Sequence, residues 1–257
     1  MSNKRLEELN IKLFADGANI QEMIKFATRP YIKGFTTNPT LMRQAGIVDY
    51  EGFAREVLAA IPLHPISFEV FADELGEMEK QARHIATWGD NVNIKIPVTN
   101  TRGEFTGPII ERLSDDGIIL NVTAITTLEQ VQKVGDSFAD GASGIVSVFA
   151  GRIADSGVDP EPHMKKALEI VASKPGLELL WASPRELFNI IQADRIGCPI
   201  ITVSHALLDK LPLLGKDLTQ FSLETVQMFA KDAQASKYTI FYGPHRHDKE
   251  REIHESR

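Results

Sequence analysis

The 257-residue sequence contains a single cysteine, Cys198, and this scarcity excludes two classes of site. An internal disulfide and a multi-cysteine zinc site both need at least a second thiol. We expect Cys198 to fill a small space in a turn before a strand. The sequence also lacks any run of about 18 apolar residues that could cross a membrane, and its N-terminus, MSNKRLEELN, lacks the apolar core of a signal peptide. We therefore expect a cytoplasmic protein with no membrane partner.

Basic residues are in the minority, with 28 Lys and Arg against 35 Asp and Glu, for a net charge of −7 and a pI near 5.6. No basic patch stands out, so we expect no nucleic-acid partner, because an acidic protein repels a polyphosphate backbone. A few arginines could still bind a small anion. The 43% hydrophobic and 25% charged content is that of an ordinary globular domain.

Eight short, β-rich apolar runs recur along the chain, and each is followed by an amphipathic stretch. This alternation predicts parallel βαβ units, and eight of them without a linker favour an α/β fold of the (β/α)8 TIM barrel type, covering residues 1–216. The expected strands are 11–15, 33–36, 65–71, 91–96, 117–123, 143–148, 177–181 and 199–203. The expected helices lie near 20–28, 50–60, 74–87, 106–115, 126–138, 160–173, 184–193 and 204–210.

A further helix is predicted over 217–236, outside the eight-fold repeat. Its apolar stripe must pack on the barrel or on a neighbouring subunit, and consists of Leu223, Val226, Phe229 and Ala230. Residues 243–257 are nearly all charged or polar, which predicts a flexible tail. Two tail histidines, His245 and His247, could chelate a metal, but a solvated tail is the favoured interpretation.

The segment NVNIKIPVTN (91–100) sets one lysine, Lys95, between isoleucines. Side chains of a barrel strand alternate between the interior and the helix layer, and the aliphatic side chains of this strand belong against the helices. Lys95 and Asn93 should therefore point inward. The same alternation puts three polar side chains of the neighbouring strands on the inner face: Glu69, Asn121 and Thr123.

Further polar residues follow the ends of other strands, where the chemistry of barrel enzymes is located. They are Asp16, Asn38, Ser147, Arg152, Ser183 and Arg185, together with the aromatic Phe149. Two arginines with two serines beside them match the oxygens of a tetrahedral anion, so we expect a phosphate site. A simpler alternative is that Lys95 and Glu69 form a structural ion pair, and that the arginines are surface residues paired with Asp155 or Glu186.

A buried lysine suggests covalent chemistry. A free lysine is neutral in only about one molecule in 2500 at pH 7, and burial in general favours the neutral amine that attacks carbonyls. We hypothesise that Lys95 forms an imine with a ketose, so that the C3–C4 bond can break to leave an enamine. Glu69 and Thr123 suit proton transfer during imine formation, and Asp16 suits removal of the C4 hydroxyl proton. Asn38 and Asn121 would hold sugar hydroxyls.

The sequence resembles the transaldolases, in particular the small branch that includes the fructose-6-phosphate aldolases. Five ordered motifs carry the resemblance: GFTTNPTL (34–41), NIKIPVT (93–99), LNVTAITT (120–127), VSVFAGRI (146–153) and LWASPREL (180–187). The resemblance implies that Lys95 is the Schiff-base lysine, Asp16 the acid/base for carbon–carbon cleavage, and Glu69 with Thr123 the pair that positions a catalytic water. It assigns the dihydroxyacetone unit to Asn38, Asn121 and Ser147, and the phosphate to Arg152, Ser183 and Arg185.

The resemblance also implies that no metal and no dissociable cofactor takes part. It implies an enzyme of carbohydrate metabolism, in the pentose phosphate pathway, that acts on sugar phosphates. The helix at 217–236 resembles one that small transaldolases pack on a neighbouring subunit, which implies a homo-oligomer between a dimer and a decamer.

Within this family, a glutamate at position 69 and a phenylalanine at position 149 are typical of transaldolases, whereas the aldolases tend to have glutamine and tyrosine. A phenyl ring cannot help to protonate the enamine, so the enamine should wait for an acceptor aldehyde, which favours a transferase. Two positions depart from the family pattern. Gly17 stands where threonine is usual, and Val148 where proline is usual; both could alter the sugar preference.

Two alternatives remain at this point. The first is a class I aldolase that releases free dihydroxyacetone, which an assay with and without an acceptor would detect. The second is a non-catalytic sugar-phosphate binder, although a binder has no need for the combination of Lys95, Glu69 and Asp16. The donor could be fructose 6-phosphate, sedoheptulose 7-phosphate, or a sulfonated or unusual sugar.

Overall fold

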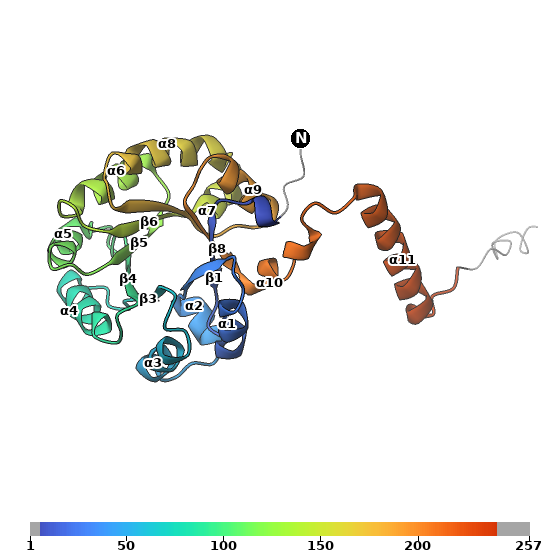
Figure 1. Ribbon diagram of the computed structural model, residues 1–257, viewed down its shortest axis with the longest axis horizontal. Helices are drawn as coiled ribbons and strands as arrows, with labels where there is room; N and C mark the ends of the chain where they lie inside the picture. Colours follow the sequence, from blue (N-terminus) through green and yellow to red (C-terminus); the bar gives the residue numbers. More distant parts are fainter. Residues whose placement is uncertain (1–5, 241–257) are drawn as a thin grey trace, which may run out of the picture. The chain divides into compact units, whose positions relative to one another are not determined.

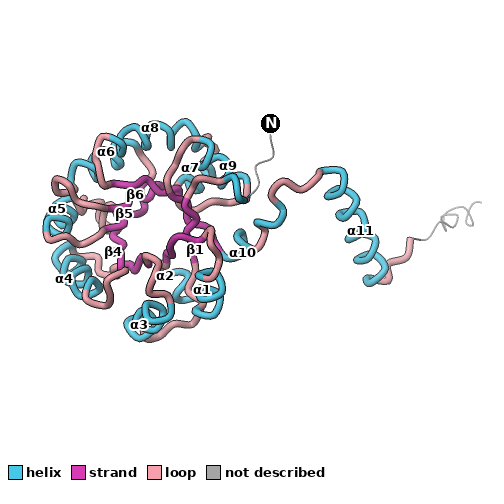
Figure 2. The backbone as a smooth tube through the Cα atoms, in the orientation of Figure 1, coloured by secondary structure: helices cyan, strands magenta, loops and turns pink. Residues whose placement is uncertain are grey.

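The computed structural model describes residues 6–240 and contains a closed barrel of eight parallel strands in chain order, β1 to β8. Figures 1 and 2 show the strands as an inner ring with the helices around it. The predicted (β/α)8 barrel is confirmed. The strands are β1 Lys12–Asp16, β2 Ile32–Thr36, β3 Ile66–Glu69, β4 Val92–Pro97, β5 Leu120–Ile125, β6 Gly144–Val148, β7 Leu177–Trp181 and β8 Ile200–Ser204.

The helices around the barrel match most of the predicted helical segments. They are α1 Ile20–Ala27, α2 Pro39–Gln44, α3 Tyr50–Ala60, α4 Leu75–Ala86, α5 Gly107–Asp115, α6 Leu128–Ser137, α7 Ala150–Asp155, α8 Pro160–Ala172, α9 Phe188–Arg195 and α10 His205–Leu208. Two short 3-10 helices cover Leu6–Glu8 and Leu211–Leu213. Helices α2 and α7, six residues each, were not predicted, because so short a helix has no apolar periodicity to detect.

The prediction of a helix from residue 184 was wrong by four residues, since α9 begins at Phe188. The side-chain oxygen of Asn189 accepts hydrogen bonds from the backbone N–H groups of Arg185 and Glu186, at 2.7 and 3.1 Å. These hydrogen bonds satisfy two backbone N–H groups of the loop that leads into α9, so this loop does not need to be helical. Arg185 therefore lies in the loop after β7 and not on a helix.

The predicted alternation of side chains is present on β4. On β4, Ile94 and Ile96 are fully buried in the large core between the strands and the helices, whereas Lys95 faces the interior. A second, smaller apolar cluster fills the interior itself and consists of Phe14, Ile145, Leu180, Ala182 and Ile200. Burying each large side chain of this cluster contributes roughly 1.5–3 kcal/mol to folding.

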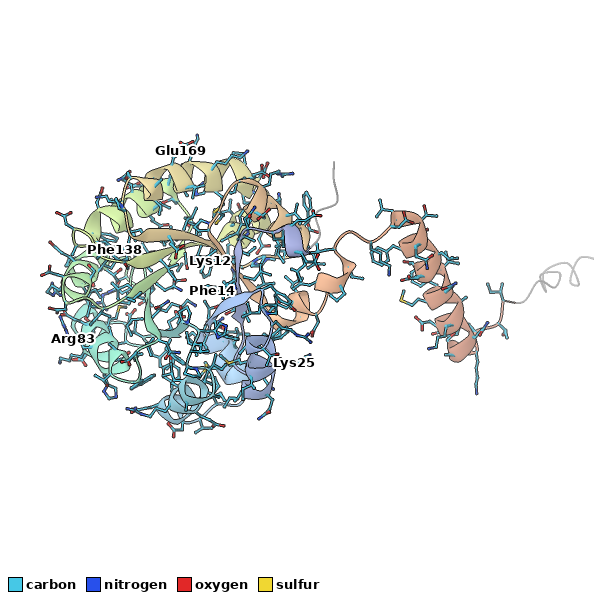
Figure 3. All side chains as sticks on the ribbon, viewed as in Figure 1. Lys12, Phe14, Lys25, Arg83, Phe138 and Glu169 are labelled. Carbon is cyan, nitrogen blue, oxygen red and sulfur yellow. The ribbon has the colours of Figure 1, made fainter. Side chains whose placement is uncertain are left out.

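The interior cluster determines where polar residues can lie. In the inward-facing set of each strand, Phe14 is followed two residues later by Asp16, Ile145 by Ser147, and Ile200 by Thr202. Figure 3 shows the dense packing of side chains, with Phe14 labelled on β1. The apolar layer therefore closes the barrel beneath the C-terminal ends of the strands, and the polar layer lies above it.

One glycine makes room for this interior layer. Gly34 lies opposite Phe14 in the β1–β2 register, and a Cβ at position 34 would lie 2.6 Å from the Phe14 ring. Real Cβ atoms are not found that close to a neighbour, so the position of the Phe14 ring requires a glycine at position 34. The GFTT segment thus contains both Gly34, which makes room for Phe14, and Thr36, which ends β2.

A second compact unit begins at Gly215 and contains helix α11, Leu218–Ser236, which corresponds to the predicted helix 217–236. The side chain of Asp217 caps it by accepting a hydrogen bond from the Gln220 N–H at 2.9 Å. Residues of α11 are exposed or half-buried, including the predicted stripe. The predicted tail 243–257, with His245 and His247, lies outside the described residues.

Cys198 lies in the turn before β8, as predicted, and is buried. Burial raises the pKa of its thiol to about 12, so the thiol stays protonated and unreactive near neutral pH. Among residues 6–240, no helix is long and apolar enough to span a membrane.

Candidate active site

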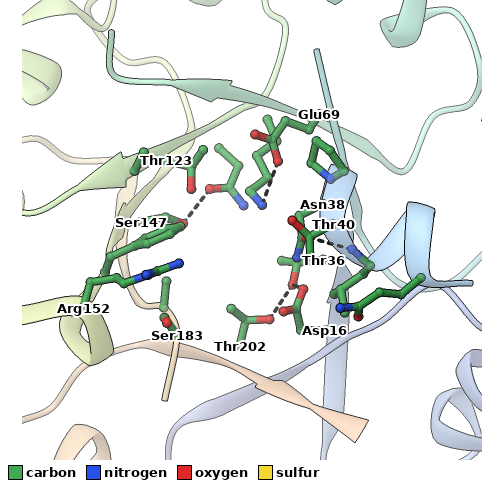
Figure 4. A pocket seen from close by; sticks show the side chains of 18 residues that line it. Asp16, Thr36, Asn38, Thr40, Glu69, Thr123, Ser147, Arg152, Ser183 and Thr202 are labelled. Atoms are coloured by element: carbon green, nitrogen blue, oxygen red, sulfur yellow. Dashed lines mark hydrogen bonds and ion pairs between the residues drawn. The ribbon is translucent and has the colours of Figure 1, made fainter. Parts of the chain in front are cut away.

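A pocket of about 510 Å³ opens at the C-terminal ends of the barrel strands, and the polar layer lines it (Figure 4). This is the end of the barrel at which barrel enzymes carry their chemistry. The structure brings ten of the predicted site residues into this pocket: Asp16, Asn38, Glu69, Lys95, Asn121, Thr123, Ser147, Phe149, Arg152 and Ser183. Arg185 is not among the residues that line it.

Lys95 is only 7% exposed, and its ammonium group has two neighbours. Its Nζ donates a hydrogen bond to the backbone carbonyl of Thr37 at 3.0 Å and lies 3.1 Å from Oε2 of Glu69. The contact with Glu69 is close enough for an ion pair, but Oε2 makes no hydrogen bond within the described chain. A buried ion pair contributes little to stability, because desolvation of the two charges offsets their attraction.

Thr123 provides a second buried acceptor that has no hydrogen-bond partner within the described residues. Its backbone lies at an irregularity in the β5–β6 register, and the next residue, Ala124, adopts a left-handed conformation with φ of 63°. An irregularity of this type re-aims side chains at a strand end. Buried polar atoms are normally hydrogen-bonded, so Glu69 and Thr123 together offer sites for a water molecule or a substrate hydroxyl.

Asp16 occupies the opposite side of the pocket from Glu69 (Figure 4). Oδ1 of Asp16 accepts a hydrogen bond from the Thr36 hydroxyl at 2.7 Å, and that hydroxyl is hydrogen-bonded in turn to Thr202 on β8. Burial raises the pKa of Asp16 above its ordinary value, opposed by the charge of Lys95, by the hydrogen bond from Thr36, by His205 and by Asn38. A carboxyl with a raised pKa is able both to take up and to return a proton.

A chain of hydrogen bonds runs along the floor of the pocket from β6 to β3. The Ser147 hydroxyl donates to Oδ1 of Asn121 at 2.6 Å, and Nδ2 of Asn121 donates to Oγ of Ser67 at 3.0 Å. These bonds fix the orientation of the Asn121 amide and still leave it one N–H and one lone pair. Asn121 can therefore contact a substrate in one defined orientation.

Asn38 is the N-cap of α2, and its side-chain oxygen accepts a hydrogen bond from the Leu41 N–H at 3.0 Å. Pro39 follows at the first helical position, where its missing N–H costs nothing. The sequence TNPT is therefore a helix start that holds Asn38 at the edge of the pocket. Its amide group remains able to donate to Asp16 or to a ligand.

Arg152 extends from the first turn of α7, and Ser183 follows β7, so both reach the pocket on the same side (Figure 4). Ser183 has a left-handed backbone with φ of 62°. The N–H of Gly151 donates to the carbonyl of Ala182 at 3.3 Å, and a Cβ at position 151 would lie 1.6 Å from the Ser183 oxygen. The glycine of FAGRI thus allows α7 to lie directly against the loop that carries Ser183.

Arg185 lies outside the lining of the pocket, and its guanidinium group is bound by Asp155 at the end of α7. Nε of Arg185 donates to Oδ1 of Asp155 at 3.0 Å, and Nη2 donates to Oδ2. This is one of the pairings foreseen for a surface arginine. It holds the pKa of the Asp155 carboxyl below its usual range. Arg185 would have to exchange this carboxylate for a phosphate in order to contact a ligand.

Sequence reasoning missed the pocket residues Thr36 and Thr202, which support Asp16. Thr36 stands in the GFTT segment, and the strand alternation would have placed Thr202 on the inner face of the strand predicted at 199–203. It also missed the part of the rim formed by α2, which adds Thr40, Leu41 and Gln44. No group of three or more His, Cys, Asp or Glu side chains able to hold a metal is present within residues 6–240.

Comparison with known proteins relates this geometry to a family. Residues 13–240 match the family model described as "Transaldolase/Fructose-6-phosphate aldolase". A "Probable transaldolase" of Dehalococcoides mccartyi is 34% identical over 216 residues, which cover 82% of this chain and 96% of that protein. A "Probable transaldolase" of Nitrosopumilus maritimus is 31% identical over 229 residues, which cover 88% and 96%.

A solved structure of a cube-shaped, highly porous protein cage, designed by fusing symmetric oligomeric domains, is similar with a TM-score of 0.55. The match covers 89% of this chain and 82% of the other at 12% identity, and so concerns the fold alone. The family model spans the strands that carry Asp16, Glu69, Lys95 and Thr123. On the evidence of this match and of the two relatives, the chain belongs to the transaldolase/fructose-6-phosphate aldolase family.

Proposed function

We propose that the protein is a transaldolase that transfers a dihydroxyacetone unit from a ketose phosphate to an aldose phosphate through a Schiff base on Lys95. The donor is fructose 6-phosphate, sedoheptulose 7-phosphate or a related anionic sugar. The observation that carries the proposal is the position of the Lys95 amine, buried inside the barrel 3.1 Å from Glu69 and sharing a pocket with Asp16. Family membership and the names of the relatives support it.

In the proposed reaction, the neutral amine of Lys95 adds to the C2 carbonyl of the ketose to give a carbinolamine. Glu69 protonates the departing hydroxyl, directly or through a water held with Thr123, and the imine forms. Asp16 then takes the proton of the C4 hydroxyl while the C3–C4 bond breaks. The bonding electrons move into the protonated imine, which becomes an enamine, and the aldose phosphate leaves.

The second half of the reaction reverses these steps with a new aldehyde. The enamine carbon attacks the acceptor carbonyl, and Asp16 returns its proton to the new alkoxide. Hydrolysis of the imine then frees the product ketose. Asn38, Asn121 and Ser147 hold the dihydroxyacetone hydroxyls, and Phe149 offers no hydroxyl that would help to protonate the enamine before an acceptor arrives. This last point favours a transferase over the alternative, a class I aldolase that releases free dihydroxyacetone.

The phosphate-binding group in this proposal consists of Arg152, Ser183 and Arg185. Arg152 and Ser183 already line the pocket, and an arginine suits phosphate because its planar donors match two oxygens at once. Arg185 joins them by giving up its contact with Asp155. No metal ion and no cofactor has a step in this scheme. We further propose that the enzyme works in the cytoplasm.

Borohydride trapping tests the proposal. The protein is reduced in the presence of each candidate ketose and then digested, and the modified peptide is identified by mass. We expect an adduct on Lys95 and none in Lys95→Met. Lys12→Met is the matched control, since Lys12 is an exposed lysine at the N-terminal end of β1, whereas Asp16 and the pocket lie at the C-terminal end. Trapping on another lysine, or turnover retained by Lys95→Met, would contradict the proposal. Turnover without an acceptor aldehyde would favour the aldolase.

We also propose a homo-oligomer formed through α11. The helix presents large apolar side chains, Val226, Met228 and Phe229 among them. Exposed apolar groups in such number are typical of a protein interface. Light scattering on Phe229→Glu, with Lys231→Glu as the matched control on the same helix, should show dissociation of the first variant only.

A further inference from the structure

Position 17, directly after Asp16, is closely packed against a histidine from the other end of the barrel sequence. A Cβ built on Gly17 would lie 2.3 Å from Cε1 and 2.5 Å from Nε2 of His205. Gly17 does not have a positive φ, so the backbone does not require glycine here. The imidazole ring of His205 is what excludes a side chain at position 17.

His205 is firmly held in this position. It begins α10, directly after β8, and its side chain is only 11% exposed. Its ring centroid lies 4.9 Å from that of Phe26, and Nδ1 lies 2.6 Å from Oε2 of Glu22, both on α1. A carboxylate can only accept, so Nδ1 is assigned the proton of this hydrogen bond. Nε2 then lies over Gly17, buried and without a hydrogen-bond partner in the described chain.

The histidine is also electrostatically coupled to the carboxyl of Asp16. The charged groups that act on Asp16 are Lys95, from β4, and His205 when it is protonated. Glu22 faces His205 from α1. A second charged pair between α1 and the end of α10 joins Lys25 and Asp209 at 3.8 Å. The histidine thus contacts the strand end that bears the proposed base and influences the charge of that base.

We propose that His205, anchored by Glu22, is a positioning residue for Asp16: its ring fills the space left by the absent side chain at position 17 and holds the carboxyl in place for carbon–carbon cleavage. The inference rests on the proposed function. It makes positions 17 and 205 a matched pair, because a larger residue at 17 displaces the ring, and a smaller residue at 205 leaves the end of β1 unsupported.

A double-mutant cycle tests the pairing. We expect Gly17→Ala and His205→Ala each to lower kcat by about 10-fold or more, because small displacements of a reacting group have effects of this size. In both variants KM should stay within about threefold. Once His205 is absent, the added methyl no longer meets a ring, so Gly17→Ala/His205→Ala should be no slower than His205→Ala alone. Independent, multiplying effects of the two substitutions would overturn the inference.

The species trapped by borohydride without acceptor separates positioning of Asp16 from a general structural role. Wild type should yield mainly the dihydroxyacetone adduct on Lys95, because cleavage follows imine formation. His205→Ala should form the imine at the wild-type rate but accumulate the adduct of the uncleaved ketose. An unchanged ratio of the two adducts in His205→Ala would overturn the inference.

Two further variants complete the design. Glu22→Gln removes the charged acceptor of His205 while keeping its shape, and should show a milder accumulation of the uncleaved adduct. His84→Ala is the matched control, because His84 forms a similar pair with Glu51 at 3.0 Å, away from the pocket, and should leave the ratio unchanged. If no ketose is trapped on Lys95 in the wild type, the proposed function itself fails. If trapping is normal and the cycle shows no coupling, only the role of His205 fails.

Discussion

Nζ of Lys95 and Oε2 of Glu69 lie 3.1 Å apart inside the barrel, as an ion pair without a hydrogen bond. The carboxylate oxygen is close enough to act on any group attached to the amine, and it accepts no hydrogen bond from residues 6–240. Oε2 of Glu69 is therefore free to accept a hydrogen bond from a water or a substrate, as the proposed function requires.

Glu69→Gln should slow imine formation on Lys95, because an amide cannot shuttle the proton that the departing carbinolamine hydroxyl needs. We expect kcat to fall by about 10²–10⁴-fold, the usual contribution of a positioned acid or base. The rate at which borohydride-trappable adduct appears is the measurement. Glu178→Gln is the matched control, since Glu178 pairs with Lys12 at the other end of the barrel. An unchanged rate of adduct formation in Glu69→Gln would rule out the assigned role.

Asp16→Asn should make the protein more stable at neutral pH while abolishing carbon–carbon cleavage. Burial raises the pKa of Asp16, so the folded state binds this proton more tightly than the unfolded chain does. The stability contributed by the carboxyl is therefore complete below its unfolded pKa of about 3.8 and is lost as the pH rises through the folded pKa. The variant should unfold at higher urea concentration than wild type at pH 8, with the difference vanishing near pH 4.

The control for this measurement is Asp155→Asn, whose carboxyl has the opposite shift. Arg185 lowers the pKa of Asp155, so its contribution to stability is present above the unfolded pKa and is lost as the pH falls through the folded pKa. Asp155→Asn should be slightly less stable than wild type at pH 8. If both variants moved in the same direction, the burial argument for Asp16 would be wrong.

Arg152→Gln should raise KM for phosphorylated ketoses by about 10–100-fold, since a hydrogen bond to a charged group contributes roughly 1.5–3 kcal/mol. Arg185→Gln should have a smaller effect, because binding first requires Arg185 to leave Asp155. Unphosphorylated fructose, assayed at high concentration, is the reference substrate. Equal losses on the two substrates would place the phosphate elsewhere.

Phe149→Tyr should convert part of the transferase activity into acceptor-independent release of dihydroxyacetone. Phe149 lines the pocket directly before α7, and a hydroxyl on its ring would offer a proton to the waiting enamine. The measurement is free dihydroxyacetone formed from fructose 6-phosphate without an aldose acceptor. Phe188→Tyr, on the exposed side of α9, is the control and should release none. The absence of release in both variants would contradict the role assigned to the ring.

The alternation of side chains along strands explains why so much of the site was predictable. Lys95 could be assigned to the interior because its neighbours Ile94 and Ile96 had to face the helices, and the structure has this arrangement. Of the polar residues placed by this rule, Lys95, Glu69, Asn121 and Thr123 line the pocket. Asn93, two residues before Lys95 on β4, lines a separate cavity instead. The alternation within one strand is therefore enough to predict on which side of the barrel wall a side chain lies.

Contacts between distant segments were not predictable in this way. The loop position of Arg185 depends on the Asn189 side chain and on Asp155, which lies thirty residues earlier in the chain. Gly17 was noticed as a departure from the family pattern, but its partner His205 is nearly two hundred residues away. Val148, the other departure, lies in the core outside the barrel and not in the pocket lining. The spacing of residues in the sequence does not predict such contacts between distant segments.

The pairing of β1 with β8 has a consequence for the growing polypeptide. Asp16 is translated early, but Thr202, which supports it through Thr36, is among the last barrel residues to leave the ribosome. A nascent chain that has folded only as far as β7 would already carry Lys95 and Glu69, yet its carboxyl at position 16 would lack the final strand. The carboxyl of Asp16 therefore gains its full set of supporting hydrogen bonds only once the ring has closed.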